Sequence, residues 1–157
     1  MQNDRTMHIV LHQPQIPHNT GAIGRLCVAL GAELHLIHPL GFHLTQKEIR
    51  RAGLDYWEHL QLFEWDCVQS FWACYAPNST HHFCSTKAQK SLYEARLIAP
   101  CFLHFGREDA GIPSEILNRY AEQCYKIPMQ STARSLNLAT AVAIVGYESF
   151  RQTISRI

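Results

Sequence analysis

The sequence lacks long apolar runs, paired cysteine motifs and an excess of charge of one sign. No stretch approaches the ~18 consecutive apolar residues of a membrane-spanning helix. The first six residues are polar and lead into a short strand-like run, so we expect no targeting or anchoring segment. The formal net charge is +1 with histidines neutral, which excludes a strong overall field for nucleic acid. Any RNA-binding surface therefore has to be a local basic patch.

The cysteines are dispersed and form no Cys-x-x-Cys pair; they are Cys27, Cys67, Cys74, Cys84, Cys101 and Cys124. Most lie in apolar segments, where a free thiol behaves as a small hydrophobic side chain. No group of histidines and cysteines has the spacing of a zinc site, and the ten histidines are scattered, so we assign them no role. This pattern predicts reduced thiols, a cytoplasmic location, and no metal.

The length and the alternation of patterns predict one α/β domain over residues 1–157. A chain of 157 residues with 46% hydrophobic content can bury one core. Apolar, β-prone runs alternate with helical periodicity, which favours a parallel sheet flanked by helices on both faces. The expected strands are 7–11, 34–37, 59–63, 81–85, 101–105 and 123–127. The expected helices are one capped by Asn19 or Thr20 and ended by Gly31, a basic one over 45–52 closed by Gly53, one over 66–75, one starting near Pro113, and one after Ser135.

Ligands of such sheets collect at the loops that follow the strands, and three of these loops carry polar residues. The last one, from Ile127 to Asn137, runs into a helix of small apolar residues. Ser135 is suited to cap that helix, and Asn137 to satisfy the loop; the alternative is that both also face a ligand. The other two loops are 17–25, with two glycines and Arg25, and 105–113, with Arg-Glu-Asp between Gly106 and Gly111. Taken alone, the first loop is also explained by close packing at its glycines, and the second by a solvated turn. Neither loop has the Gly-x-Gly-x-x-Gly pattern of a dinucleotide site.

Together the three loops resemble the signature blocks of the SPOUT RNA 2′-O-methyltransferases. The blocks are Asn-Thr-Gly-x-Ile-x-Arg at 19–25, Phe-Gly-x-Glu-x-x-Gly-Ile-Pro at 105–113, and Ile-Pro-Met at 127–129 followed by Arg-Ser-Leu-Asn-Leu at 134–138. Gly-Phe at 41–42 and Arg-Arg-Ala-Gly-Leu-Asp-Tyr at 50–56 resemble, within them, the tRNA (cytidine(34)-2′-O)-methyltransferase (TrmL) family. Arg107-Glu-Asp departs from the Pro-Glu-Thr often found in that family and resembles other ribose methylases.

The resemblance implies a C-terminal deep trefoil knot that binds S-adenosyl-L-methionine, and a homodimer acting on the wobble nucleotide, cytidine or uridine 34, of leucine tRNAs. The alternatives are a non-catalytic RNA-binding protein of the same fold and a ribose methyltransferase acting at another tRNA or rRNA position. The cofactor contacts that the resemblance implies are Cys84, Gly106, Glu108, Ile127, Ser135 and Leu136. Its catalytic candidates are Arg25, Asn19, Ser135 and Asn137.

Methyl transfer to a ribose hydroxyl needs positioning and a proton acceptor more than it needs a metal. Because a guanidinium stays protonated in proteins, we expect Arg25 to hold phosphate and stabilise developing negative charge, and not to act as the base. The anticodon stem-loop is the implied partner. Its expected basic contacts are Lys87, Arg134, Arg50 and Arg51. Tyr56, Trp57, Trp65 and Trp72 could stack on unpaired bases, although packing is an equally ordinary use of them.

Overall fold

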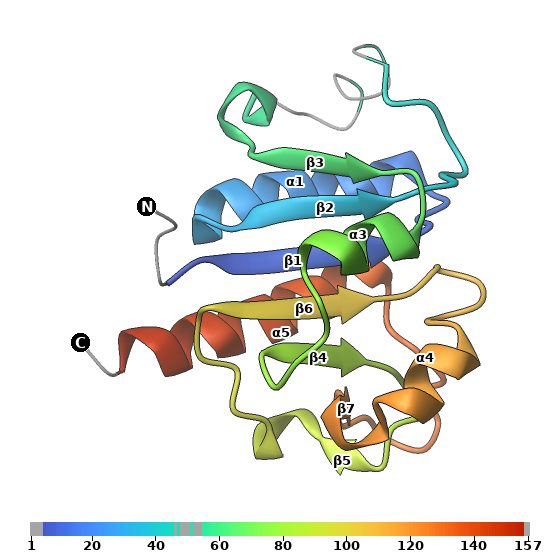
Figure 1. Cartoon of the computed structure of the whole chain (residues 1–157), viewed down its shortest axis with the longest axis vertical. Coiled ribbons are helices and arrows are strands. Elements are labelled where there is room, and N and C mark those ends of the chain that lie inside the picture. The colour runs from blue at the N-terminus through green and yellow to red at the C-terminus, as the bar shows by residue number, and fades with distance from the viewer. Residues whose placement is uncertain (1–4, 46, 48–50, 52–54, 156–157) are drawn as a thin grey trace.

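A computed structural model of the chain describes residues 5–45, 47, 51 and 55–155. Its centre is a seven-stranded sheet of order β3-β2-β1-β6-β4-β7-β5, in which all described pairs are parallel (Figure 1). The strands are β1 (Met7–His12), β2 (Glu33–Ile37), β3 (Leu62–Trp65), β4 (His81–Cys84), β5 (Lys90–Ser91), β6 (Cys101–Phe105) and β7 (Cys124–Lys126). The predicted α/β class with a parallel sheet is confirmed.

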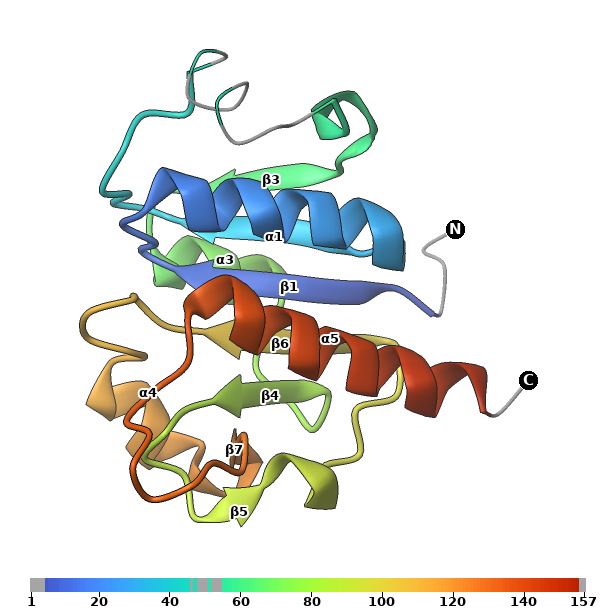
Figure 2. The same cartoon turned by 180° about the vertical axis from the view of Figure 1, so that it is seen from behind.

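Helices cover both faces of the sheet, as the sequence pattern predicts. The α-helices are α1 (Pro17–Leu30), α3 (Val68–Cys74), α4 (Ser114–Arg119) and α5 (Leu138–Ile154). Short 3-10 turns are η1 (Trp57–His59), η2 (Leu92–Glu94) and η3 (Ala121–Gln123). Helices α1 and α5 lie side by side on one face, and α3 and α4 lie on the other (Figures 1 and 2). In the described part of the chain, no helix is both long and apolar enough to cross a membrane.

Strand β1 is the centre of the core because it pairs with β2 on one side and β6 on the other. All six of its residues are buried. Met7, Ile9 and Leu11 pack under α1 and α5, whereas Val10 packs with Phe71 of α3 on the opposite face. A strand covered on both faces needs no polar side, which is why the run lacks a clean alternation of apolar and polar residues.

The start of α1 differs from the prediction. The helix begins at Pro17 with Ile16 at the N-cap, so Asn19 and Thr20 are buried inside its first turns and do not cap it. Proline at the first helical position is favoured because it has no N–H to leave unpaired and its φ suits a helix. The predicted stop is confirmed, since Gly31 takes the left-handed conformation at φ 65°.

The third strand also differs from the prediction. Residues 57–59 form η1, and β3 begins only at Leu62. Its start is set by pairing with β2, in which Leu34 lies opposite Leu62 and Ile37 opposite Trp65. The two-residue edge strand β5 was not predicted because so short a run has no period. The basic helix expected over 45–52 falls largely outside the described residues.

Histidines that look scattered in the sequence gather on the α3 face of the sheet. Five of them, all at most 8% exposed, belong to this histidine layer: His8, His12, His35, His81 and His104. Nδ1 of His104 lies 3.0 Å from Nε2 of His12, and its Nε2 lies 2.9 Å from Nδ1 of His81. The period of two along parallel strands places alternate residues on one face, so the layer follows from strand register.

Candidate active site

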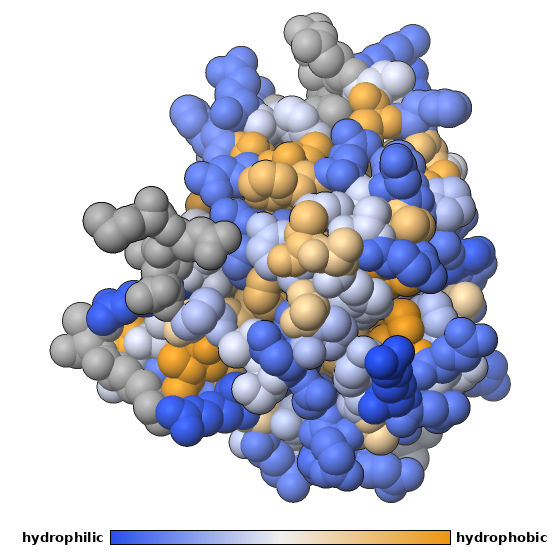
Figure 3. All heavy atoms as spheres, in the orientation of Figure 1, coloured by the Kyte–Doolittle hydropathy of each residue, from blue (hydrophilic) through white to orange (hydrophobic). Residues whose placement is uncertain are grey.

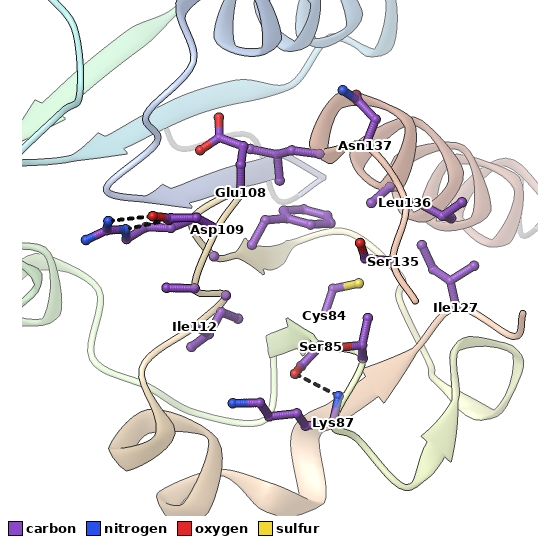
Figure 4. Close-up of a pocket in the computed structure, with 18 of the residues that line it drawn as sticks. Cys84, Ser85, Lys87, Glu108, Asp109, Ile112, Ile127, Ser135, Leu136 and Asn137 are labelled. Carbon is purple, nitrogen blue, oxygen red and sulfur yellow. Dashed lines mark hydrogen bonds and ion pairs between the residues drawn. The ribbon is translucent and has the colours of Figure 1, made fainter. Parts of the chain in front are cut away.

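A cavity of about 620 Å³ opens where β4, β6 and β7 end and α5 begins. The three blocks meet around it, although they are far apart in sequence (Figure 4). Predicted site residues that line it are Asn19, Cys84, Lys87, Gly106, Glu108, Ile127, Ser135, Leu136 and Asn137. The volume lies in the range of small-molecule and cofactor sites, ~300–1,000 Å³.

A chain of hydrogen bonds joins the three blocks at the cavity's edge. Asn137 Nδ2 donates to Asn19 Oδ1 at 3.0 Å, across 118 residues of sequence. Asn19 Nδ2 lies 3.4 Å from Glu108 Oε1 and donates to it. The Glu108 carboxylate also accepts from the backbone N–H groups of Gln15 at 2.8 Å and Ile16 at 3.1 Å. Its negative charge thus sits at the positive end of α1 and links that helix to the second block.

The cap of α5 is Asn137 and not Ser135, which corrects the prediction. Asn137 Oδ1 accepts from the N–H groups of Ala139 at 2.9 Å and Thr140 at 3.3 Å. The helix begins two residues later than expected because the amide of Asn137 caps it through Oδ1 and at the same time donates to Asn19 through Nδ2. Ser135 is exposed and lines the cavity, so its hydroxyl stays available to a ligand.

The second block folds back on itself as a tight hairpin. Arg107 and Gly111 exchange backbone hydrogen bonds of 3.2 and 2.8 Å, and Gly111 has φ 70°. A Cβ on Gly106 would lie 1.9 Å from the carbonyl carbon of Gly111, so only glycine fits there. Arg107 pairs with Asp109 through two hydrogen bonds of 3.0 Å each on the loop surface. The unusual Arg-Glu-Asp sequence thus carries its own ion pair.

Cys84 ends β4 and forms part of the cavity wall. It is half-buried, and burial raises the pKa of its thiol to about 12. A thiol with so high a pKa stays protonated and is a poor nucleophile at neutral pH. Cys84 therefore contributes an apolar surface and no nucleophilic chemistry.

The predicted arginines that the structure describes, which are Arg25, Arg51 and Arg134, do not line the cavity. Arg25 is exposed on α1, where its guanidinium carbon lies 4.9 Å from the ring centroid of Tyr56. Arg134 and Arg51 are also exposed and do not line the cavity, whereas Arg50 lies outside the described residues. Lys87 is exposed at the cavity's edge. Trp65 and Trp72 pack against Phe71 in the hydrophobic core, so packing is their use here.

Several lining residues were missed by sequence reasoning. They include Ile16, Ser85, Thr86, Ile112, Met129 and Leu138. Ile112, Met129 and Leu138 belong to the blocks but were not singled out, and Ile16, Ser85 and Thr86 lie beside a block or follow a strand. The rule that loops after parallel strands meet at one edge would have found them, but their residue types carry no chemical signal of their own.

One group of described side chains has the composition of a metal site, at the opposite end of the strands. Ligand atoms of His8, Glu33 and His35 lie within 4.8 Å of one another. The indole N–H of Trp65 donates to Nδ1 of His35 at 3.1 Å. Because tryptophan can only donate, Nδ1 is unprotonated and the proton of neutral His35 sits on Nε2, the atom that faces His8 at 3.0 Å. That nitrogen has no lone pair for a metal in this arrangement, so the cluster is better described as hydrogen-bonded core.

Comparison with known proteins agrees with this geometry. Residues 6–147 match the SpoU rRNA Methylase family. The tRNA (cytidine(34)-2′-O)-methyltransferase of Aeromonas hydrophila is 44% identical over 147 residues, which cover 93% of this chain and 94% of that protein. A solved structure concerned with the 2-OH methylation of C/U34 on tRNA superposes with a TM-score of 0.90 at 42% identity, covering 99% of this chain and 100% of the other.

A more distant structure shares the fold. The SpoU methyltransferase AviRb from Streptomyces viridochromogenes, in complex with the cofactor AdoMet, has a TM-score of 0.81 at 22% identity and covers 99% of this chain and 60% of its own. The resemblance carried by the three blocks is confirmed by the match over most of the chain. This chain belongs to the SpoU rRNA Methylase family.

Proposed function

We propose that this chain is an S-adenosyl-L-methionine-dependent tRNA 2′-O-ribose methyltransferase that acts on the wobble nucleotide, cytidine or uridine 34, of leucine tRNAs. The observation that carries the proposal is the hydrogen-bonded chain Glu108–Asn19–Asn137, which joins all three blocks beside one cavity. The choice of nucleotide rests on two relatives at 42–44% identity, one named for methylation of cytidine 34 and one solved to explain methylation of C/U34 on tRNA.

The cavity suits the cofactor in size and in chemistry. Apolar Ile112, Ile127 and Leu138 offer walls for a planar base, and the polar backbone of the hairpin after Gly106 lies beside them. When bound, S-adenosylmethionine supplies an electrophilic methyl group on its sulfonium. Cys84, Gly106, Glu108, Ile127, Ser135 and Leu136 are the residues that we propose to hold it.

The chain's own residues would position the ribose. Asn19 and Asn137 are locked to each other and to Glu108, so the edge of the cavity near them is rigid before substrate arrives. Ser135 is exposed and lines the cavity, so its hydroxyl can bond to the cofactor or the ribose. Arg25 lies outside the cavity on the exposed surface of α1, where its fork of donors would hold the phosphate next to the target ribose.

The basic residues around the cavity would contact the anticodon stem-loop. Lys87 lies at the cavity's edge, and Arg134 lies on the exposed loop before α5. Arg50 and Arg51 are proposed as further tRNA contacts from the sequence alone. Such contacts neutralise phosphates, so tRNA affinity should fall steeply as salt rises.

A trefoil knot and a homodimer complete the proposal. The segment before β6 crosses the C-terminal half of α5, where Leu97 N and Ala99 N donate to the side chains of Gln152 at 2.8 Å and Thr153 at 3.1 Å. A chain that returns through its own loop would make such a contact, and the knot itself is carried over from the family resemblance. For the dimer, α5 exposes Tyr147, Phe150 and Ile154, which lie three and four residues apart and so on one side of the helix. On the opposite face of the molecule, apolar residues form several groups separated by polar ones (Figure 3).

The test combines cofactor binding with mapping of the methylated nucleotide. Purified protein should bind S-adenosylmethionine in calorimetry and transfer one methyl group to leucine tRNA isolated from cells that lack this protein. Nuclease digestion and mass spectrometry should then find the 2′-O-methyl group at nucleotide 34. Binding of tRNA without transfer would support the non-catalytic alternative, and a methyl group elsewhere would support a different position.

A further inference from the structure

The surroundings of Arg25 contain a feature that the three blocks do not include. Arg25 forms no ion pair with any described residue, and its neighbour is the ring of Tyr56. The guanidinium carbon lies 4.9 Å from the ring centroid, within the ~6 Å range of a cation–π contact. Both side chains are exposed, so the pair lies on the surface of the protein.

The backbone around Tyr56 is held against α1. Tyr56 accepts from the N–H of His59 at 3.0 Å, which closes the first turn of η1. Trp57 and Leu60 pack on Gly24, since a Cβ built there would be 3.2 Å from a side-chain atom of each. Gly24 thus allows the turn to approach the helix closely, and Arg25 is the next residue along that helix. Gly24 therefore fixes where η1 packs on α1, and the adjacent Arg25 contacts the residue just before that turn, Tyr56.

We propose that Tyr56 is a positioning residue for Arg25. An unpaired arginine on a helix surface samples many rotamers, and a phosphate or ribose can be held only in some of them. The aromatic face restricts the guanidinium without occupying its N–H donors, which remain free for substrate. A carboxylate partner would hold the arginine more firmly but would compete with the phosphate for the same donors. This inference rests on the proposed function, in which Arg25 engages the ribose or its phosphate.

The central comparison is Tyr56→Leu with Tyr56→Phe, because phenylalanine keeps the aromatic face and leucine removes it. Tyr56→Leu should lower kcat for methyl transfer about two- to fivefold, as expected for losing an exposed cation–π contact. Tyr56→Phe should stay close to wild type. The KM for tRNA and the affinity for S-adenosylmethionine should change little in either variant. Equal rates in all three proteins, or an equal loss in both variants, would overturn the inference.

A second measurement reads the contact directly. The Nε–H resonance of Arg25 in a ¹⁵N–¹H spectrum should be displaced by the ring current of Tyr56. Tyr56→Phe should preserve that displacement and Tyr56→Leu should abolish it. Gly24→Ala, whose added methyl group presses on Trp57, should change the resonance in the same direction as Tyr56→Leu. An unchanged resonance in Tyr56→Leu would show that the ring does not hold Arg25.

A fourth variant, Arg25→Ala, distinguishes failure of this inference from failure of the proposed function and from direct stacking of Tyr56 on RNA. Arg25→Ala tests the proposed function, because unchanged turnover would remove Arg25 from the reaction whatever Tyr56 does. If Arg25→Ala loses turnover but Tyr56→Leu does not, only the positioning role fails. Direct stacking of Tyr56 on an RNA base would instead appear as weaker tRNA binding on adding Tyr56→Leu to Arg25→Ala, a result that also overturns the positioning role.

Discussion

The histidine layer should make this protein unusually sensitive to mild acid. Burial lowers the pKa of His8, His12 and His81 from 6.5 to about 4 in each case. In the unfolded chain these side chains regain an ordinary pKa and take up protons below pH ~6.5. The folded state binds fewer protons, so its stability is complete above pH ~6.5 and is lost as the pH falls toward 4.

The size of the effect follows from the same shifts. At pH 5, a histidine whose pKa is 6.5 unfolded and about 4 folded costs about 2 kcal/mol relative to pH 8. The three histidines are coupled, since His12 and His81 both bond to His104, so their costs do not simply add; one alone is a sizeable part of the ~5–15 kcal/mol that a typical domain has. The slope near pH 5 should approach about 1.4 kcal/mol per pH unit for each of them.

The assay is urea unfolding followed by tryptophan fluorescence between pH 5 and 8 at fixed protein concentration, since association of the chain would also affect stability. His12→Gln keeps a donor near His104 and removes one titrating ring, so it should flatten the slope by about 1.4 kcal/mol per pH unit. His59→Gln, at an exposed position of η1, is the matched control. A free energy of unfolding that is flat from pH 5 to 7.5 would refute the reasoning, as would equal slopes in wild type and His12→Gln.

Three further predictions concern the cavity. Gly106→Ala should abolish cofactor binding in calorimetry, because its Cβ would lie 1.9 Å from Gly111 and must open the hairpin; near-normal affinity would show that the loop can yield. Asn137→Ala should lower the free energy of unfolding in urea by ~1–2 kcal/mol through loss of the α5 cap, and should also lower kcat. Asn137→Asp should keep most of the stability but lose the hydrogen bond that Asn137 donates to Asn19. Equal stability of the two variants would argue against the cap. Iodoacetamide at pH 7.5 should label exposed Cys67 quickly and Cys84 hardly at all by mass spectrometry, and rapid labelling of Cys84 would contradict its burial.

Much of the architecture could be predicted because it depends on local chemistry. Apolar runs separated by helical periods require a parallel sheet, and the stop at Gly31 follows from the freedom of glycine at φ 65°. The meeting of the three blocks follows from a general property of such sheets, whose strands end at a common edge. That rule and the family resemblance together predicted that Asn19, Glu108 and Asn137 would line the cavity.

Several of the errors have a different origin, which is contact between distant residues. Ser135 is a reasonable cap by composition, but Asn137 takes the position because its amide also reaches Asn19, 118 residues away. β3 starts at Leu62 because pairing with β2 determines the register, and no local signal marks that residue. Glu108 supplies the negative charge at the start of α1 from another loop, which no reading of residues 15–20 could reveal.

The sequence by itself determined the fold class, the family and the loops that carry chemistry, because these depend on periodicity and on short motifs. Tertiary structure alone decided which atoms satisfy one another. It engaged the Glu108 carboxylate, left the Ser135 hydroxyl open to the cavity and set Arg25 against Tyr56. It also gathered histidines without an assigned role into one buried layer, whose neutral state is a consequence of burial. The physical reason is that a hydrogen bond or a desolvation cost depends on neighbours in space, and these neighbours are brought together only when the sheet closes over its helices.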